Sequence, residues 1–159
     1  RTLTSANAVA FTDDGLEVAF VAGGDLWVMD TELREPKRVT NTPHDETSPV
    51  FAPDGKSIFF VSEKGGKTDI FQAKRSNEKR PWFLNSSFVV EQVTKDGEYK
   101  YGLSFSPEGS KLAYIQGRGN LMVADADGKN PKEVIKSWNA PSYDWSPDGK
   151  WFLVDFNPE

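Results

Sequence analysis

The sequence predicts an all-β protein, in the form of a partial β-propeller with four-stranded antiparallel blades. Three observations lead to this fold class: a turn phrase that recurs four times, a strand order that recurs with it, and a length too short to close a ring. Each phrase reads aromatic, small residue, usually Pro, acid, Gly, and the four glycines are Gly15, Gly55, Gly109 and Gly149. Their intervals of 40, 54 and 40 residues match the period of a propeller blade.

The composition of the phrase predicts a tight turn between two strands. Pro pre-sets the φ angle of the second turn position, the acid bonds back to the turn backbone, and Gly takes the positive φ that reverses the chain. A run rich in β-forming residues follows each phrase, at 17–21, 57–61, 111–115 and 150–154. We therefore interpret each phrase as the hairpin that joins the first two strands of a blade.

Two further strands recur in the same order. Third strands are expected at 25–30, 69–74 and 120–125, and fourth strands at 37–40, 91–94 and 132–135. A β-sandwich could also hold four strands in each unit, but it does not require every unit to repeat the same turns. The inner strands should be apolar without strict alternation, because neighbouring blades cover both faces of a blade.

The repeats divide the chain into about three and a half blades. We expect the outer strand of a preceding blade at 1–4 and a blade at 5–40. A second blade follows at 41–94, with an insertion at about 76–90, then a third at 95–135 and the first half of a further blade at 136–159. Six or seven blades need roughly 240 to 300 residues. The chain is therefore expected to be a segment of a longer polypeptide, or to complete its ring by self-association.

The insertion carries several apolar side chains that favour burial, namely Trp82, Phe83, Leu84 and Phe88. Two destinations are open: an adjacent domain, or the blade from which the insertion emerges. Asn85-Ser86-Ser87 also fits a glycosylation acceptor.

Composition excludes several classes of function. The chain has no cysteine, which removes disulfides, thiol catalysis and Cys-based zinc sites. Its formal charge of −5 argues against nucleic acid as a partner. No apolar run is long enough for a membrane span.

Some short segments resemble catalytic or cofactor-binding motifs, but each lacks a residue that the motif requires. Gly65-Gly66-Lys67-Thr68 resembles the end of a P-loop, but Val61 stands where the earlier glycine is required. A calcium loop starting at Asp125 would need an acid where Lys136 stands. The chain has one histidine, His44, and no nucleophile elbow. We expect no catalytic residue, no cofactor and no metal in this chain.

A ligand or partner is expected at the face where the blade-to-blade connections and the loops between second and third strands emerge. The candidate contact residues on that face are His44, Asp45, Glu46, Asp96, Glu98, Tyr99, Lys100, Arg118 and Asn139.

The repeat resembles a known family. Ser146-Pro147-Asp148-Gly149-Lys150 with its apolar strand, and the segment 121–131 leading to Val134, resemble the WD-like propeller repeats of TolB and tricorn-type proteases. The connection 41–51 and the ending 155–157 are most similar to the amino-terminal propeller of bacterial tricorn protease homologues.

This resemblance implies two functions of different classes. The first is a non-catalytic propeller segment of a larger tricorn-like serine peptidase, acting in substrate access and domain organisation, with further blades, a PDZ module and the protease core as partners. The alternative is a TolB-like protein-binding scaffold of the bacterial envelope, whose partner is another protein or peptide. The resemblance implies a periplasmic or exported location, with the cytoplasm as the alternative.

Overall fold

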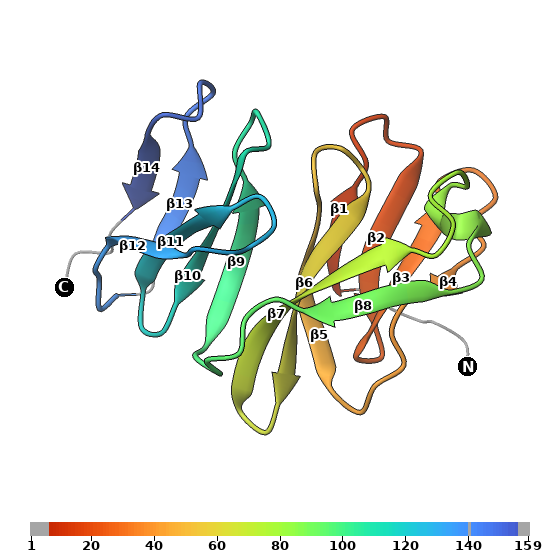
Figure 1. The fold of residues 1–159 in the computed structure, drawn as a ribbon, viewed down its shortest axis with the longest axis horizontal. Coiled ribbons are helices and arrows are strands. Elements are labelled where there is room, and N and C mark those ends of the chain that lie inside the picture. The colour runs from red at the N-terminus through yellow and green to blue at the C-terminus, as the bar shows by residue number, and fades with distance from the viewer. Residues whose placement is uncertain (1–6, 140, 156–159) are drawn as a thin grey trace.

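A computed structural model describes residues 7–139 and 141–155, whose strands form four antiparallel sheets in succession along the chain (Figure 1). We call these sheets blades 1 to 4. Blade 1 contains β1 (Asn7–Phe11), β2 (Glu17–Ala22), β3 (Asp25–Asp30) and β4 (Lys37–Arg38). Blade 2 contains β5 (Asp45–Phe51), β6 (Ser57–Lys64), β7 (Lys67–Arg75) and β8 (Phe88–Gln92). Blade 3 contains β9 (Lys100–Phe105), β10 (Lys111–Gln116), β11 (Asn120–Asp125) and β12 (Lys132–Ile135).

Blade 4 is the pair β13 (Ser142–Trp145) and β14 (Phe152–Asp155). Strands in blades 1 to 3 pair in chain order, as a propeller requires, and the predicted fold class is confirmed. The outer strand expected at 1–4 lies outside the described residues, and so does the part of the expected last segment beyond residue 155.

The turn phrases form the hairpins that the sequence predicts. In all four, the glycine has a φ between +69° and +78°, a conformation that favours glycine. In blade 1, the Thr12 hydroxyl accepts a hydrogen bond from the Glu17 amide at 3.1 Å. In blades 3 and 4 the hydroxyls of Ser106 and Ser146 likewise accept a hydrogen bond from the amide five residues later in the chain. Blade 2 has Ala52 at this position and therefore lacks the hydroxyl.

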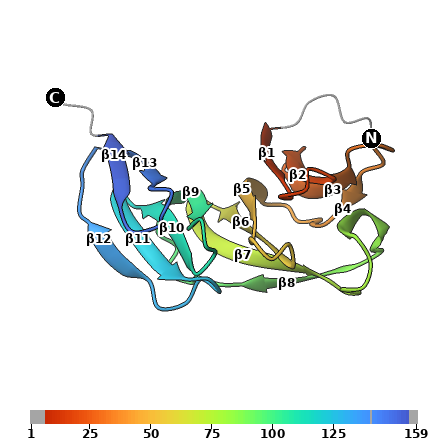
Figure 2. The same cartoon turned by 90° about the horizontal axis from the view of Figure 1, so that it is seen from above.

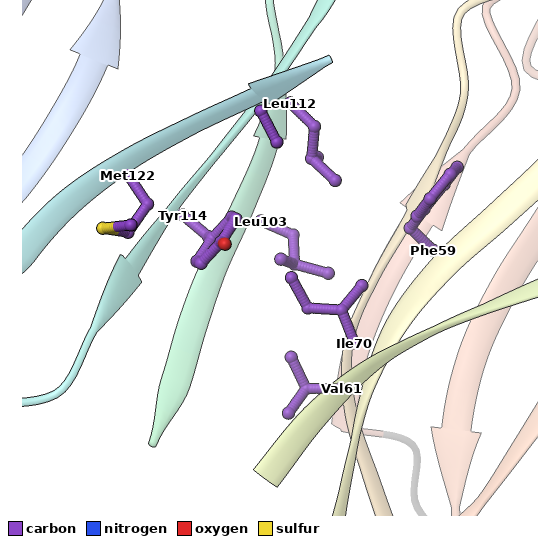
Figure 3. Packing of buried hydrophobic residues seen from close by; sticks show 8 residues of the cluster. Phe59, Val61, Ile70, Leu103, Leu112, Tyr114 and Met122 are labelled. Atoms are coloured by element: carbon purple, nitrogen blue, oxygen red, sulfur yellow. The ribbon is translucent and has the colours of Figure 1, made fainter. Parts of the chain in front are cut away.

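Neighbouring blades pack face to face through alternate side chains of their middle strands. Ile58 and Phe60 of β6 join the core shared with blade 1. Phe59 and Val61 point the other way, into the core shared with blade 3, which contributes Leu103, Leu112 and Tyr114 to it (Figure 3). Both sets are almost fully buried, which confirms that an inner strand covered on two faces is apolar without alternation.

The blades follow an arc rather than a flat row (Figure 2). The first strands β1, β5, β9 and β13 lie on its concave side, and the fourth strands β4, β8 and β12 lie on its convex side. At the two ends, apolar side chains have no further blade against them within the described residues. Phe11 of β1 is 60% exposed and Leu153 of β14 is 74% exposed.

The insertion between β7 and β8 packs against the blade that precedes it. Its short 3-10 helix η1 (Trp82–Leu84) places Trp82 in the core between blades 1 and 2. The Trp82 indole donates to the Gly55 carbonyl at 2.9 Å, and the Phe83 amide donates to Glu17 at 3.1 Å. Asn85 is buried and bonds the carbonyls around it, which removes it as an accessible glycosylation acceptor.

The expected fourth strand of blade 2, at 91–94, is wrong by three residues at its start. β8 begins at Phe88 and pairs with β7 as far as Gln92, so the last residues assigned to the insertion belong to the sheet. Val93 and Thr94 instead donate their amides to the Ile70 carbonyl.

Candidate functional site

The nine candidate residues lie at one end of the blades, which we call the loop face. It is formed by the connections between blades and by the β2–β3, β6–β7 and β10–β11 hairpins (Figure 1). We call the opposite end, where the β1–β2, β5–β6, β9–β10 and β13–β14 hairpins lie, the turn face. Asp45, Glu46 and Lys100 lie within strands β5 and β9. His44, Asp96, Glu98, Tyr99, Arg118 and Asn139 lie in the connecting segments.

Glu46 points inward rather than to solvent. Only 2% of it is exposed, and its Oε1 accepts a hydrogen bond from Thr42 at 2.9 Å, while Oε2 has no partner. Burial raises the pKa of Glu46 to about 7, with Asp25 and Asp45 acting in the same direction and the hydroxyls of Thr42 and Ser62 opposing it. The Glu46 carboxyl group therefore changes from its protonated to its ionised form near neutral pH.

Lys100 is also buried, with 1% exposed. Its ammonium group donates to the Glu98 carbonyl at 2.8 Å and to the Thr68 carbonyl at 3.3 Å, and it forms ion pairs with Asp96 and, at 3.6 Å, Asp69. Because Thr68 and Asp69 belong to blade 2, this side chain joins blades 2 and 3. A buried charge needs such partners.

Glu46 and Lys100 occupy the same position of the repeat, five residues before the aromatic residue of the turn phrase. The main chain at this position bonds to the preceding blade in both cases: the Glu46 amide donates to Gly24 at 2.9 Å, and the Lys100 amide donates to Thr68 Oγ1 at 2.7 Å. The position therefore holds consecutive blades together. A single sequence could not distinguish this inward position from an exposed loop position.

Three exposed residues on the loop face make up what we call the aromatic patch: Tyr99, Arg118 and Trp138. Arg118 lies over the Trp138 ring at 5.9 Å, and the Gly117 amide donates to the Tyr99 carbonyl at 2.8 Å. Trp138 is 70% exposed and Tyr99 is 54% exposed. Sequence reasoning missed Trp138, although an aromatic residue in a polar connection between blades was the available signal.

The first strands carry a repeated irregularity that the sequence did not predict. In blades 1 to 3 the first strand has a register shift, and the residue three positions before the turn aromatic has a positive φ: Ala8 and Ser48 at 52° and Gly102 at 66°. A bulge bends a strand and re-aims its side chains, and bulges often occur near binding sites. All three lie on the concave side of the arc (Figure 2).

Two hollows lie on the turn face. One of about 270 Å³ is formed where the first three turn phrases converge, with Phe11, Phe51 and Phe105 in its lining. Another of about 480 Å³ lies between blades 2 and 3. Ala52 lines both, at the position where the other turns have a hydroxyl.

Across residues 7–139 and 141–155, no three His, Asp or Glu side chains gather in a way that could hold a metal ion. None of the described helices has the length and apolar character needed to cross a membrane.

Comparison with known proteins identifies the family of this chain. The model of the TolB beta propeller domain matches residues 3–153. The chain belongs to this family. Among curated relatives of this TolB-type propeller, the uncharacterized peptidase YuxL of Bacillus subtilis is 28% identical over 92% of the chain and 21% of its own length. The Tol-Pal system protein TolB of Helicobacter pylori is 25% identical over 71% of the chain and 32% of its own length.

Solved structures show the same fold for this TolB-type propeller. TolB from Acinetobacter baumannii aligns with a TM-score of 0.74 at 20% identity, covering 97% of the chain and 38% of that protein. The tricorn protease aligns with a TM-score of 0.66 at 16% identity, covering 84% of the chain and 13% of that protein. The chain spans between about a fifth and a half of the length of the curated relatives it matches.

Proposed function

We propose that this chain is a non-catalytic propeller segment of a larger tricorn-like serine peptidase, where it binds polypeptide substrates and organises the neighbouring domains. The observation that carries the proposal is the aromatic patch of Tyr99, Arg118 and Trp138 on the loop face. Trp, Tyr and Arg are the side chains that most often dominate protein–protein contacts. Tyr99 directly precedes β9, so the patch adjoins a strand of the concave side.

The peptidase context is supported by the relatives. YuxL is named a peptidase, and this chain aligns with only part of it, as expected for an accessory region. The fold similarity to the tricorn protease agrees with this context. The partners in this proposal are the remainder of the same polypeptide and the substrate peptide. The proposal keeps the blade boundaries expected from the repeat, at 5–40, 41–94, 95–135 and 136–159.

The remaining candidate residues contribute in two ways in this proposal. His44, Asp45, Asp96, Glu98 and Asn139 extend the contact surface around the aromatic patch. The buried side chains at the repeat position of Glu46 hold the blades that carry this surface.

The test compares a large and a small substrate of the full-length protein that carries this chain. Replacing Trp138 by Ala is expected to raise KM for reduced casein several-fold and to leave the hydrolysis of a chromogenic tripeptide unchanged, because only the long chain reaches the loop face. Trp151→Ala is the matched control, since Trp151 is 72% exposed on the turn face. Absence of a protease core in the full-length polypeptide, or equal effects on both substrates, would refute the proposal.

A second candidate is a TolB-like protein-binding scaffold of the bacterial envelope, favoured by the similarity to TolB proteins in sequence and fold. In that case the aromatic patch holds a protein partner instead of a substrate. Affinity purification from an envelope fraction should then recover one stoichiometric partner with the Trp151→Ala protein and lose it with Trp138→Ala. Such a result, with no peptidase core in the same polypeptide, favours this candidate over the first.

A further inference from the structure

The cleft of about 480 Å³ on the turn face lies between blades 2 and 3, away from the aromatic patch. Phe59 and Phe105 are in its lining, with their rings 5.4 Å apart in an edge-to-face contact. Gln72 and Lys74 of β7 border it from blade 2, and the β11–β12 turn borders it from blade 3 at Ala126. Its volume is within the range of small-ligand sites.

The cleft exists because the face of blade 2 that is turned toward blade 3 changes from apolar to polar side chains along its strands. Phe59 and Val61 are covered by blade 3, but Ser57, Gln72 and Lys74 continue the same face with polar side chains. Gln72 donates to the Ser57 hydroxyl at 2.9 Å, so this surface is ordered without a covering blade.

Blade 3 comes close to blade 2 at two glycines: Gly109, which lines the cleft, and Gly128, which follows the lining residue Asp127. A Cβ on Gly109 would lie 2.9 Å from Pro53, and a Cβ on Gly128 would lie 2.5 Å from Val93. Ala126, another lining residue of blade 3, has only a small side chain at the border of the cleft.

The corresponding place between blades 1 and 2 is filled by the protein itself. Glu17 in blade 1 corresponds to Ser57 in blade 2, since both lie six residues after the turn aromatic. At Glu17 the insertion of blade 2 covers the face: the Phe83 amide bonds to the Glu17 carboxylate, and Trp82 is buried beside it. Blade 3 has only the short segment 126–131 at the equivalent connection, so no such cover reaches blade 2.

The filled site shows what kind of ligand this place accepts, namely a short polypeptide segment with an aromatic side chain. The open site differs in charge. Opposite Glu17, blade 1 has Asp30; opposite Ser57, blade 2 has Lys74, and Lys56 also lines the cleft. Glu17, which accepts the Phe83 amide on blade 1, is thus replaced by the neutral Ser57 on blade 2. Lys74 beside Ser57 is a cationic donor that can pair with an acidic group of the ligand.

The charged side chains of the cleft differ in whether they already form ion pairs or hydrogen bonds within the protein. Within the described part of the chain, neither Lys56 nor Lys74 forms an ion pair. Four carboxylates line the cleft, and three of them accept hydrogen bonds from their own turns: Asp54 from the Lys56 amide, Glu108 from the Ser110 hydroxyl and Asp127 from the Lys129 amide. The fourth is Glu78 of the insertion. These carboxylates repel an acidic ligand, so binding requires that its acidic group reach the lysines.

We propose that this cleft binds a short segment of a partner protein in which an aromatic side chain lies next to an acidic one. The aromatic ring packs over Phe105, and the carboxylate pairs with Lys74 and Lys56. This site goes beyond the function proposed for the loop face and does not depend on it.

The test is a titration of the purified protein with three peptides, followed by amide resonances in ¹⁵N–¹H spectra. Acetyl-Glu-Trp-Phe-Glu-amide should shift the resonances of Gln72 and Ala126. Acetyl-Lys-Trp-Phe-Lys-amide and acetyl-Glu-Ala-Ala-Glu-amide should bind at least ten-fold more weakly, because each lacks one of the two required groups. Absence of binding by the first peptide, equal binding by all three, or shifts confined to the loop face would each overturn the proposal.

Charge reversal supplies the second arm. The double variant Lys56→Glu, Lys74→Glu should bind acetyl-Glu-Trp-Phe-Glu-amide at least ten-fold more weakly than the unmodified protein does. The control pair is Lys95→Glu with Lys150→Glu, which changes net charge equally and includes Lys150, the equivalent of Lys56 in blade 4. Equal weakening in both double variants would show nonspecific charge attraction and refute the site. The dispersion of each variant's spectrum reports that it is folded.

Discussion

Glu46 makes the stability of the protein depend on pH in a direction opposite to that of most carboxylates. Its side chain is 2% exposed, and burial raises its pKa to about 7 from the ordinary 4.5. That difference corresponds to about 3 kcal/mol. Between these two pH values the folded state holds the proton more firmly than the unfolded chain, so this contribution is complete below about pH 4.5 and is lost as pH rises through about 7.

The perturbation is Glu46→Gln, which keeps the shape of the side chain and cannot ionise. Urea unfolding followed by tryptophan fluorescence gives the free energy of unfolding at pH 5 and pH 8. The unmodified protein should lose up to about 3 kcal/mol more than the variant between these two values. The variant should also be the more stable of the two at pH 8.

The control is Glu63→Gln, because Glu63 is an exposed carboxylate of the same blade. This variant should follow the pH dependence of the unmodified protein. If Glu46→Gln shows the same fall in stability between pH 5 and pH 8 as the unmodified protein, the buried carboxylate is not the cause and the reasoning fails.

Three further predictions concern the contacts between and within blades. Trp82→Ala removes a 1% exposed side chain from the core between blades 1 and 2 and should cost about 3–5 kcal/mol in urea unfolding, whereas Trp138→Ala should cost under about 0.5 kcal/mol; similar values would place the insertion elsewhere. Ala52→Ser restores the hydroxyl that the other turns use and should raise the free energy of unfolding by about 1 kcal/mol; a decrease would contradict this view of the turn. Gly128→Ala places a Cβ 2.5 Å from a side chain of the neighbouring blade and should lower the thermal midpoint more than Gly55→Ala, which has a similar positive φ but open space; equal midpoints would refute the close approach.

The repeat could be predicted because its signal is local. Each turn has a glycine at positive φ and an acid that accepts a hydrogen bond within its own turn, and both residues lie within the five-residue phrase. The apolar runs after each turn then follow from burial on two faces. For this reason the hairpins at Gly15 and Gly149 were predictable without any knowledge of tertiary contacts.

Other features depend on contacts between distant residues and could not be predicted. The extra length of the second repeat places Phe88 in the insertion, but Phe88 begins β8, since pairing with Arg75 decides where the strand starts. The two open destinations of Trp82 could not be separated without knowing that it shares a core with residues of blade 1 such as Ala19 and Val28. The inward direction of Lys100 likewise depends on the acceptors that blade 2 presents to it.

The most direct test of the central claim, that consecutive sheets stack as propeller blades, is a side-chain NOE spectrum of the protein. Stacked blades predict cross-peaks from Gly109 to Pro53 and from Gly128 to Val93, two places where a glycine of blade 3 lies against a side chain of blade 2. Absence of both, together with cross-peaks between the middle strands of blades 1 and 3, would contradict the account.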